Sequence, residues 1–169
     1  KECKAIIIAC NSASAIAYDS IKQISKLPVL NVIDPVVKYV SNYLNKDIVG
    51  VIGTKATIQS NIYARKISVL SKKNKVISLA TPLLAPMIEE GFLNEKISKI
   101  IIEEYLSNDI FKNINSLILA CTHYPLITNE INDFYNGKVH VIDSSTIIAD
   151  SIKKELRSAA LGDNLLQYI

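Results

Sequence analysis

The sequence predicts an α/β fold in which helices cover parallel β-sheets. Two patterns carry this prediction: short apolar, β-branched runs alternate with segments of helical period, and the runs are apolar throughout, as strands are when both faces are buried. The third observation is composition, since 49% of the 169 residues are hydrophobic, which is enough for a substantial core. A chain of this size forms one domain or two small ones.

Strands are expected at the β-branched runs, and helices at the segments of helical period between them. Pro35, Pro82 and Pro125 support three of the helices, because each lies at or near a first turn, where no amide donor is lost. In chain order the expected strands are residues 4–9, 29–33, 48–52, 76–79, 117–120 and 139–142. The expected helices are residues 14–25, 35–44, 57–70, 82–90, 95–106, 125–134 and 145–159.

Two parts of the chain follow the same plan. Residues 6–11 and 117–122 each consist of an apolar run, Ala-Cys, and a small polar residue that opens a helix. A Val-Ile-Asp sequence ends at Asp34, 24 residues after Cys10, and another ends at Asp143, 22 residues after Cys121. Any two parallel strands can share Val-Ile-Asp by chance, but the paired Ala-Cys ends favour two similar α/β units.

Charge, glycine spacing and apolar run length exclude several classes of protein. The 19 basic and 16 acidic residues are interspersed and give a net charge of +3, so nucleic acid is not an expected partner. No glycine-rich nucleotide loop is found; the nearest approach, residues 50–54, lacks the required spacing. No apolar run reaches the ~20 residues of a membrane-spanning helix, and no signal segment opens the chain. We therefore expect a cytoplasmic protein without membrane contact.

Cys3, Cys10 and Cys121 are the three cysteines. They are odd in number and form no CxxC pair, so we expect free thiols and no metal site. Cys10 and Cys121 each follow a predicted strand and precede a helix, where the helix dipole stabilises a thiolate and lowers its pKa toward the range of a general base. The alternative, a small buried hydrophobe, is the interpretation that we adopt for Cys3.

Two such thiols on opposite sides of a cleft would suit a two-base racemisation, in which one thiolate removes a Cα proton and the other thiol supplies one. Asn11, Ser12 and Thr122 can donate hydrogen bonds to a carboxylate. Lys55 is interpreted as a solvated lysine at the start of a helix and not as a Schiff-base lysine. Pyridoxal phosphate is therefore not required, and no cofactor is expected.

Four segments resemble the cofactor-independent glutamate racemases of the aspartate/glutamate racemase superfamily, and the likeness extends over nearly the whole chain. They are residues 9–15 (ACNSASA), 53–57 (GTKAT), 86–90 (PMIEE) and 121–126 (CTHYPL). The last is highly specific, because its histidine separates glutamate racemases from aspartate racemases. The resemblance implies interconversion of L- and D-glutamate, with D-glutamate destined for peptidoglycan and glutamate as the small-molecule partner.

The resemblance also implies roles for individual residues. Cys10 and Cys121 would be the acid/base pair, with His123 assisting Cys121. The expected substrate-binding residues are Asn11, Ser12, Thr54, Thr57, Glu89 and Thr122. Among these, Glu89 would face the substrate's ammonium group. Ser12 replaces the family's usual threonine, and its hydroxyl preserves the binding group.

The family layout implies two pseudo-symmetric α/β domains with the active cleft between them. The first, discontinuous domain would comprise residues 1–37 and 142–169, and the second would comprise residues 38–141. The chain starts at Lys1, and nothing in it matches the family's Asp-Ser-Gly strand or Pro-Tyr-Gly loop. We therefore expect an incomplete first domain, in which Cys10 lacks its assisting aspartate. A homodimer is left open as the assembly state.

Three alternatives remain open. The chain could be a catalytically inactive racemase fragment that at most binds glutamate. It could be a related aspartate or hydantoin racemase, although the context of His123 argues against this. A cysteine hydrolase is the weakest alternative, because a second matched cysteine has no role in that chemistry.

Overall fold

The computed structural model describes residues 3–44, 47–93 and 96–158, and within them six parallel strands form two sheets. The smaller sheet pairs β1 (Ile6–Ile8) with β2 (Val29–Asn31). The larger has the order β4-β3-β5-β6 and consists of β3 (Ile48–Gly53), β4 (Lys75–Ala80), β5 (Ser116–Ala120) and β6 (His140–Ile142). All pairs are parallel, which confirms the predicted α/β class.

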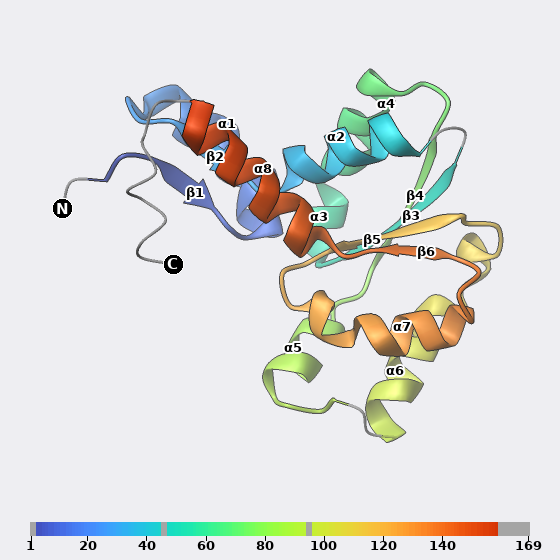
Figure 1. Ribbon diagram of the computed structural model, residues 1–169. Coiled ribbons are helices and arrows are strands. Elements are labelled where there is room, and N and C mark those ends of the chain that lie inside the picture. The colour runs from blue at the N-terminus through green and yellow to red at the C-terminus, as the bar shows by residue number, and fades with distance from the viewer. Residues whose placement is uncertain (1–2, 45–46, 94–95, 159–169) are drawn as a thin grey trace.

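Helices cover both faces of the larger sheet (Figure 1). One face carries α2 (Ile33–Tyr43), α3 (Lys55–Gln59) and α4 (Ile62–Leu70). The other carries α5 (Leu84–Glu89), α6 (Lys96–Leu106) and α7 (Thr128–Tyr135). The remaining helical segments are α1 (Asn11–Ile24), the 3-10 turns η1 (Asp109–Phe111) and η2 (Tyr124–Ile127), and α8 (Ser144–Ser158).

Strands β3 and β5 are buried on both faces, which explains their uninterrupted apolar sequences. On β3, Val49 and Val51 pack with α2 and α4, whereas Ile52 packs with α5 and α6. Leu117 and Ile118 on β5 point to opposite faces in the same way. The two hydrophobic cores therefore lie on opposite faces of the sheet, and both bury its central strands.

Two local features change the expected helix boundaries. The segment 57–70 forms two helices instead of one, because Asn61 adopts a left-handed conformation with φ 54°; asparagine tolerates this better than most residues. The strand expected at 29–33 ends at Asn31, whose Oδ1 accepts hydrogen bonds at 2.9 Å from the amides of Ile33 and Asp34. These bonds cap the first turn and start α2 early.

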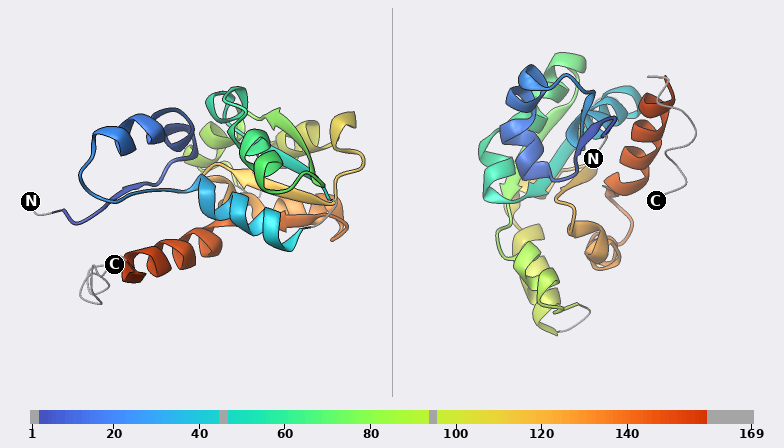
Figure 2. Two further views of the ribbon diagram at one scale, coloured as in Figure 1. Left: turned by 90° about the horizontal axis from the view of Figure 1, so that it is seen from above. Right: turned by 90° about the vertical axis from the view of Figure 1, so that its left-hand side faces the viewer.

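The two sheets lie at different ends of the molecule (Figure 2). β1, β2 and α1 form one end, the four-stranded sheet forms the other, and α2 and α8 run between them. In both repeated units the strand before Ala-Cys pairs with the next strand of the plan, β1 with β2 and β5 with β6. The Val-Ile of the second unit lies in β6, whereas residues 32–34 of the first unit follow β2 and open α2. Among the described residues, no helix is long and apolar enough to cross a membrane.

Candidate active site

Parallel strands bring their carboxyl ends to one edge of a sheet, where α/β proteins bind ligands. Cys10 follows β1 by two positions, and Thr54, Thr81 and Cys121 directly follow β3, β4 and β5. Gly53 pairs with both Ala80 and Ala120, so the last three of these residues leave the sheet side by side. The residues singled out in the sequence thus come mainly from strand ends.

Cys10 is exposed and has extended backbone immediately before α1. Its carbonyl accepts a hydrogen bond from the Ser14 amide at 2.8 Å, and the Ser14 hydroxyl donates to the Ile8 carbonyl at 2.9 Å. Ser14 therefore ties the first turn of α1 to β1. Cys10 lies at the N-terminus of a 14-residue helix, where the dipole favours negative charge.

Three hydroxyl groups meet between α1 and α3. Ser12 Oγ lies 2.7 Å from Thr54 Oγ1 and 3.2 Å from Thr57 Oγ1, and the two threonine oxygens are 3.1 Å apart. Thr54 also caps α3, because its hydroxyl accepts a bond from the Thr57 amide. Residues more than 40 positions apart in the chain therefore form one cluster of donors and acceptors, which is suited to binding a carboxylate.

Cys121, His123 and Glu89 form a chain of polar contacts. Cys121 Sγ lies 3.7 Å from His123 Nδ1, and His123 Nε2 lies 3.0 Å from Glu89 Oε1. A carboxylate only accepts, so Nε2 carries the proton in this contact. In the neutral imidazole, Nδ1 is then free to accept the thiol proton. Glu89 thus selects the imidazole tautomer that can act on Cys121.

The environment of Cys121 favours the protonated thiol. Burial raises the pKa of Cys121, the backbone amides of His123 and Tyr124 lower it, and the charges of Cys10 and Glu89 raise it further. The net effect is a raised pKa, so the lowered pKa expected for a cysteine before a helix is wrong for Cys121: burial outweighs the hydrogen bonds from the backbone amides that follow it.

The sequence prediction missed two residues, Thr81 and Tyr63. The hydroxyls of Thr81 and Tyr124 lie 2.8 Å apart, and Tyr124 also donates to the Thr81 carbonyl at 3.0 Å. Thr81 follows β4 directly, so the strand-end rule that indicates Cys10 and Cys121 also applies to it. Tyr63, on α4, donates a hydrogen bond to Asn11 at 2.7 Å, and it belongs to none of the motifs that the sequence analysis considered.

Several predicted residues lie outside these contacts. Thr122 is exposed beside Cys121. Lys55 is exposed as the first residue of α3, which fits a solvated lysine. The prediction that Cys3 is buried is wrong: Cys3 is exposed, because it precedes β1 and no described element packs over it. Tyr124 is fully buried.

A cavity of about 380 Å³ lies between α1, α2 and α4. Its walls include the apolar residues Val37 and Ile62 and the paired Asp34 and Lys66. Its lining contains neither Cys10 nor Cys121. We therefore assign the candidate active site to the strand ends and not to this cavity.

The chain matches the model of a known protein family. Residues 1–152 match the sequence profile of the Asp/Glu/Hydantoin racemase family. This chain belongs to that family. The match includes the segments that contain both Cys10 and Cys121 and extends into α8.

Named members of the Asp/Glu/Hydantoin racemase family resemble this chain over most of its length. The glutamate racemase of Syntrophus aciditrophicus is 38% identical over 157 residues, which are 93% of this chain and 58% of that protein. The glutamate racemase of Aquifex aeolicus is 40% identical over 163 residues, 96% of this chain and 63% of that protein. The chain thus spans about three-fifths of these relatives.

Solved structures from the family have the same fold. The Francisella tularensis glutamate racemase in complex with D-glutamate matches with a TM-score of 0.85 and 43% identity, over 94% of this chain and 59% of that one. The Picrophilus torridus aspartate racemase matches less well, with a TM-score of 0.66 and 26% identity over 93% of this chain and 62% of that one.

Proposed function

We propose that this protein acts as a glutamate racemase, using Cys10 and Cys121 as its two acid/base residues. The observation that carries the proposal is the position of two thiols after two parallel strands, each before a helical turn, with the charge of Cys10 acting on Cys121. The similarity to named glutamate racemases at 38% and 40% identity supports the substrate.

In the proposed reaction, one cysteine as a thiolate takes the Cα proton and becomes a thiol. The electron pair of the Cα–H bond stays on the substrate and is delocalised into its carboxylate. The second cysteine gives its proton to the opposite face of Cα and becomes a thiolate. No electron is gained or lost by the protein, and reversal of the roles carries out the opposite conversion.

His123 and Glu89 make Cys121 competent in both roles. Because the pKa of Cys121 is raised, the thiol is ready to donate, but its action as a base requires a group that takes its proton. His123 Nδ1 at 3.7 Å is that group, and the Glu89 contact at 3.0 Å keeps it unprotonated in the neutral ring. Orientation of a histidine by a carboxylate is common in acid/base sites.

The substrate carboxylates are proposed to bind to the hydroxyl cluster of Ser12, Thr54 and Thr57 and to Asn11 and Thr122. The short separations within the cluster mean that its hydroxyls now satisfy one another. A carboxylate would replace these contacts with charge-assisted hydrogen bonds, which are stronger. Glu89 is proposed to face the substrate ammonium group while it contacts His123.

Several broader expectations stay predictions. These are the absence of a cofactor, the supply of D-glutamate for peptidoglycan and the cytoplasmic location. A homodimer stays open as the assembly state. The division into residues 1–37 with 142–169 and residues 38–141 is likewise a proposal. On that division, Cys10 and Cys121 belong to different domains, which would allow the thiols to approach a substrate from opposite faces.

The test is exchange of the glutamate Cα proton with deuterated solvent, followed together with racemisation. Cys10→Ala and Cys121→Ala should each reduce both rates by at least about 100-fold, the loss typical of a missing acid or base. Cys3→Ala is the matched control, because Cys3 is exposed and precedes β1, and it should retain the full rates.

The possible results separate the alternatives. Exchange that persists in both alanine variants would contradict the two-thiol mechanism. Calorimetric binding of glutamate without exchange in the unaltered protein would identify a silent binding protein. Faster racemisation of aspartate than of glutamate, measured by circular dichroism, would favour an aspartate racemase, which the similarity to the Picrophilus torridus protein makes worth testing.

A further inference from the structure

Tyr63 connects α4 to the residue beside Cys10. Its hydroxyl donates a hydrogen bond of 2.7 Å to Oδ1 of Asn11, the first residue of α1. Tyr63 is 3% exposed and Asn11 is also 3% exposed, so the bond is shielded from water. The two residues are 52 positions apart in the chain. A buried hydrogen bond between residues so far apart in the sequence fixes the position of both side chains.

The chemistry of the two groups makes the contact directional. A carboxamide has an accepting oxygen and a donating NH₂ group at opposite corners. When Oδ1 is occupied by the Tyr63 hydroxyl, the NH₂ group must point the other way. Burial, followed by the nearby charge of Asp34, raises the pKa of Tyr63 far above its ordinary value, so the phenol remains a donor.

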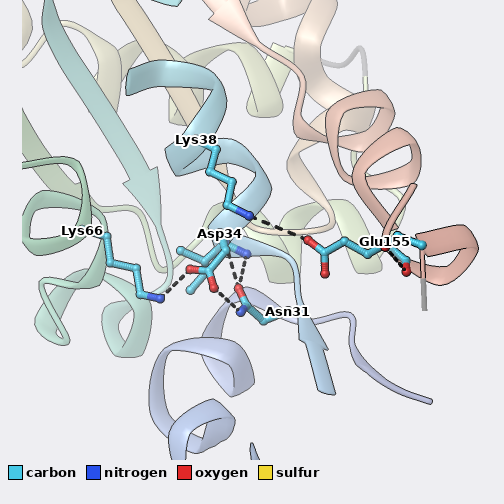
Figure 3. A network of polar contacts seen from close by, with 7 residues as sticks. Asn31, Asp34, Lys38, Lys66 and Glu155 are labelled. Carbon is cyan, nitrogen blue, oxygen red and sulfur yellow. Dashed lines mark hydrogen bonds and ion pairs between the residues drawn. The ribbon is translucent and has the colours of Figure 1, made fainter. Parts of the chain in front are cut away.

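A second polar contact comes from the same face of α4. Lys66, one turn after Tyr63, pairs with Asp34, and Asn31 Nδ2 donates to the other oxygen of Asp34 at 2.8 Å (Figure 3). Asn31 ends β2 and Asp34 lies in the first turn of α2. Helix α4 thus contacts the first residue of α1 through Tyr63 and the first turn of α2 through Lys66.

We propose that Tyr63 is a positioning residue: it holds the Asn11 carboxamide in one orientation, with Nδ2 directed to a substrate carboxylate beside Cys10. This inference rests on the proposed function, because it assigns a substrate contact to Asn11. Tyr63 itself does not touch the substrate. Its effect is on binding, and the proton transfers at the two thiols continue without it.

The first experiment measures glutamate racemisation by Tyr63→Phe, which keeps the ring and removes the hydroxyl. We expect KM to rise about tenfold, equivalent to one lost hydrogen bond, while kcat changes by less than about twofold. In a protein that carries Asn11→Ala, Tyr63→Phe should leave KM unchanged. An equal rise in KM with and without Asn11, or no rise at all, would overturn the proposal.

Lys66→Met is the matched control, since it removes the other contact of the same helix face. Lys66 touches Asp34 and not Asn11, so the variant should lower the melting temperature while KM stays the same. If Lys66→Met raises KM as much as Tyr63→Phe does, a general loosening of α4 explains both variants and the positioning role is wrong.

A second measurement does not depend on racemisation. The side-chain amide signals of Asn11, assigned in ¹⁵N NMR spectra by their loss in Asn11→Ala, should exchange with solvent slowly and become about tenfold faster in Tyr63→Phe. Unchanged exchange would contradict the positioning role whatever the activity. Accelerated exchange in a protein that does not act on glutamate would support the positioning of Asn11 and would refute the proposed function alone.

Discussion

At the scale of single residues, the candidate site depends on how its neighbours set the ionisation of Cys121. Burial makes the largest contribution to the raised pKa, and the negative charge of Glu89 adds to it. The same Glu89 fixes the imidazole tautomer of His123. One carboxylate therefore has two effects that act in opposite directions: it disfavours the thiolate directly and equips its neighbour to accept the thiol proton.

Glu89→Gln separates these effects. Removal of the charge should lower the pKa of Cys121, so alkylation of this residue should begin at a lower pH. Imidazoles are neutral in the alkaline range where such a thiol ionises. The direction of the change in the Cys121 pKa is therefore set by the lost negative charge of Glu89. The measurement is the rate of iodoacetamide labelling of the Cys121 peptide by mass spectrometry as a function of pH.

Glu90→Gln is the control for this prediction. Glu90 is the next residue, is exposed, and is not among the groups that shift the pKa of Cys121. It should leave the labelling profile unchanged. A profile that moves to higher pH in Glu89→Gln would show that His123, and not the direct charge, governs the thiol.

At the scale of the elements, close contact between β3 and β5 sets the geometry of the strand ends. A Cβ added at Gly53 would lie 3.0 Å from the carbonyl oxygen of Ala120, a backbone atom, one residue before Cys121. A Cβ at Gly50 would lie 2.9 Å from Leu117 Cδ1, the end of a side chain that can move. Alanine at position 53 would therefore displace the backbone of β5, whereas alanine at position 50 would displace the end of a side chain.

Both Gly53→Ala and Gly50→Ala should lower the free energy of unfolding by about 1–3 kcal/mol, the usual cost of overpacking. Only Gly53→Ala should also move the strand ends and reduce racemisation. Urea denaturation and the racemisation rate measure the two effects. Equal losses of activity in both variants, at equal stability, would show that the approach of β3 to β5 at Gly53 does not matter for the site.

At the scale of the whole molecule, buried tyrosines link stability to pH. Burial is the main cause of the raised pKa of both Tyr63 and Tyr124. The folded state thus keeps protons that the unfolded chain loses above about pH 10. Because the native state then binds more protons, their contribution to stability is complete below that pH and is lost as the pH rises.

The free energy of unfolding should therefore fall above about pH 10, by about 1.4 kcal/mol per pH unit for each tyrosine that stays protonated. Tyr124→Phe should flatten this dependence, whatever its effect at neutral pH. Tyr43→Phe is the control, because Tyr43 is 74% exposed, and should retain the original slope. Urea denaturation at a series of alkaline pH values provides the measurement, and equal slopes for both variants would contradict the assignment.

The local sequence pattern is sufficient to predict the strands and the two candidate acid/base cysteines of this protein. Continuous apolar runs identify all six described strands, since parallel strands buried on both faces need such sequences. The Ala-Cys pairs that follow two of these runs indicate Cys10 and Cys121 as candidate acid/base residues. The break at Asn61 is not predicted, because helical periodicity continues across it on both sides.

Contacts between distant residues depend on the tertiary structure. Ser12 meets Thr54, Glu89 meets His123 and Tyr63 meets Asn11 only after the sheets and helices pack. A sequence pattern reports which face of an element is buried, and this property is local. It does not report which hydroxyl a buried oxygen will face, because that depends on how two elements far apart in the chain are oriented. The strands and the two thiols follow from local pattern, whereas their polar partners follow from packing.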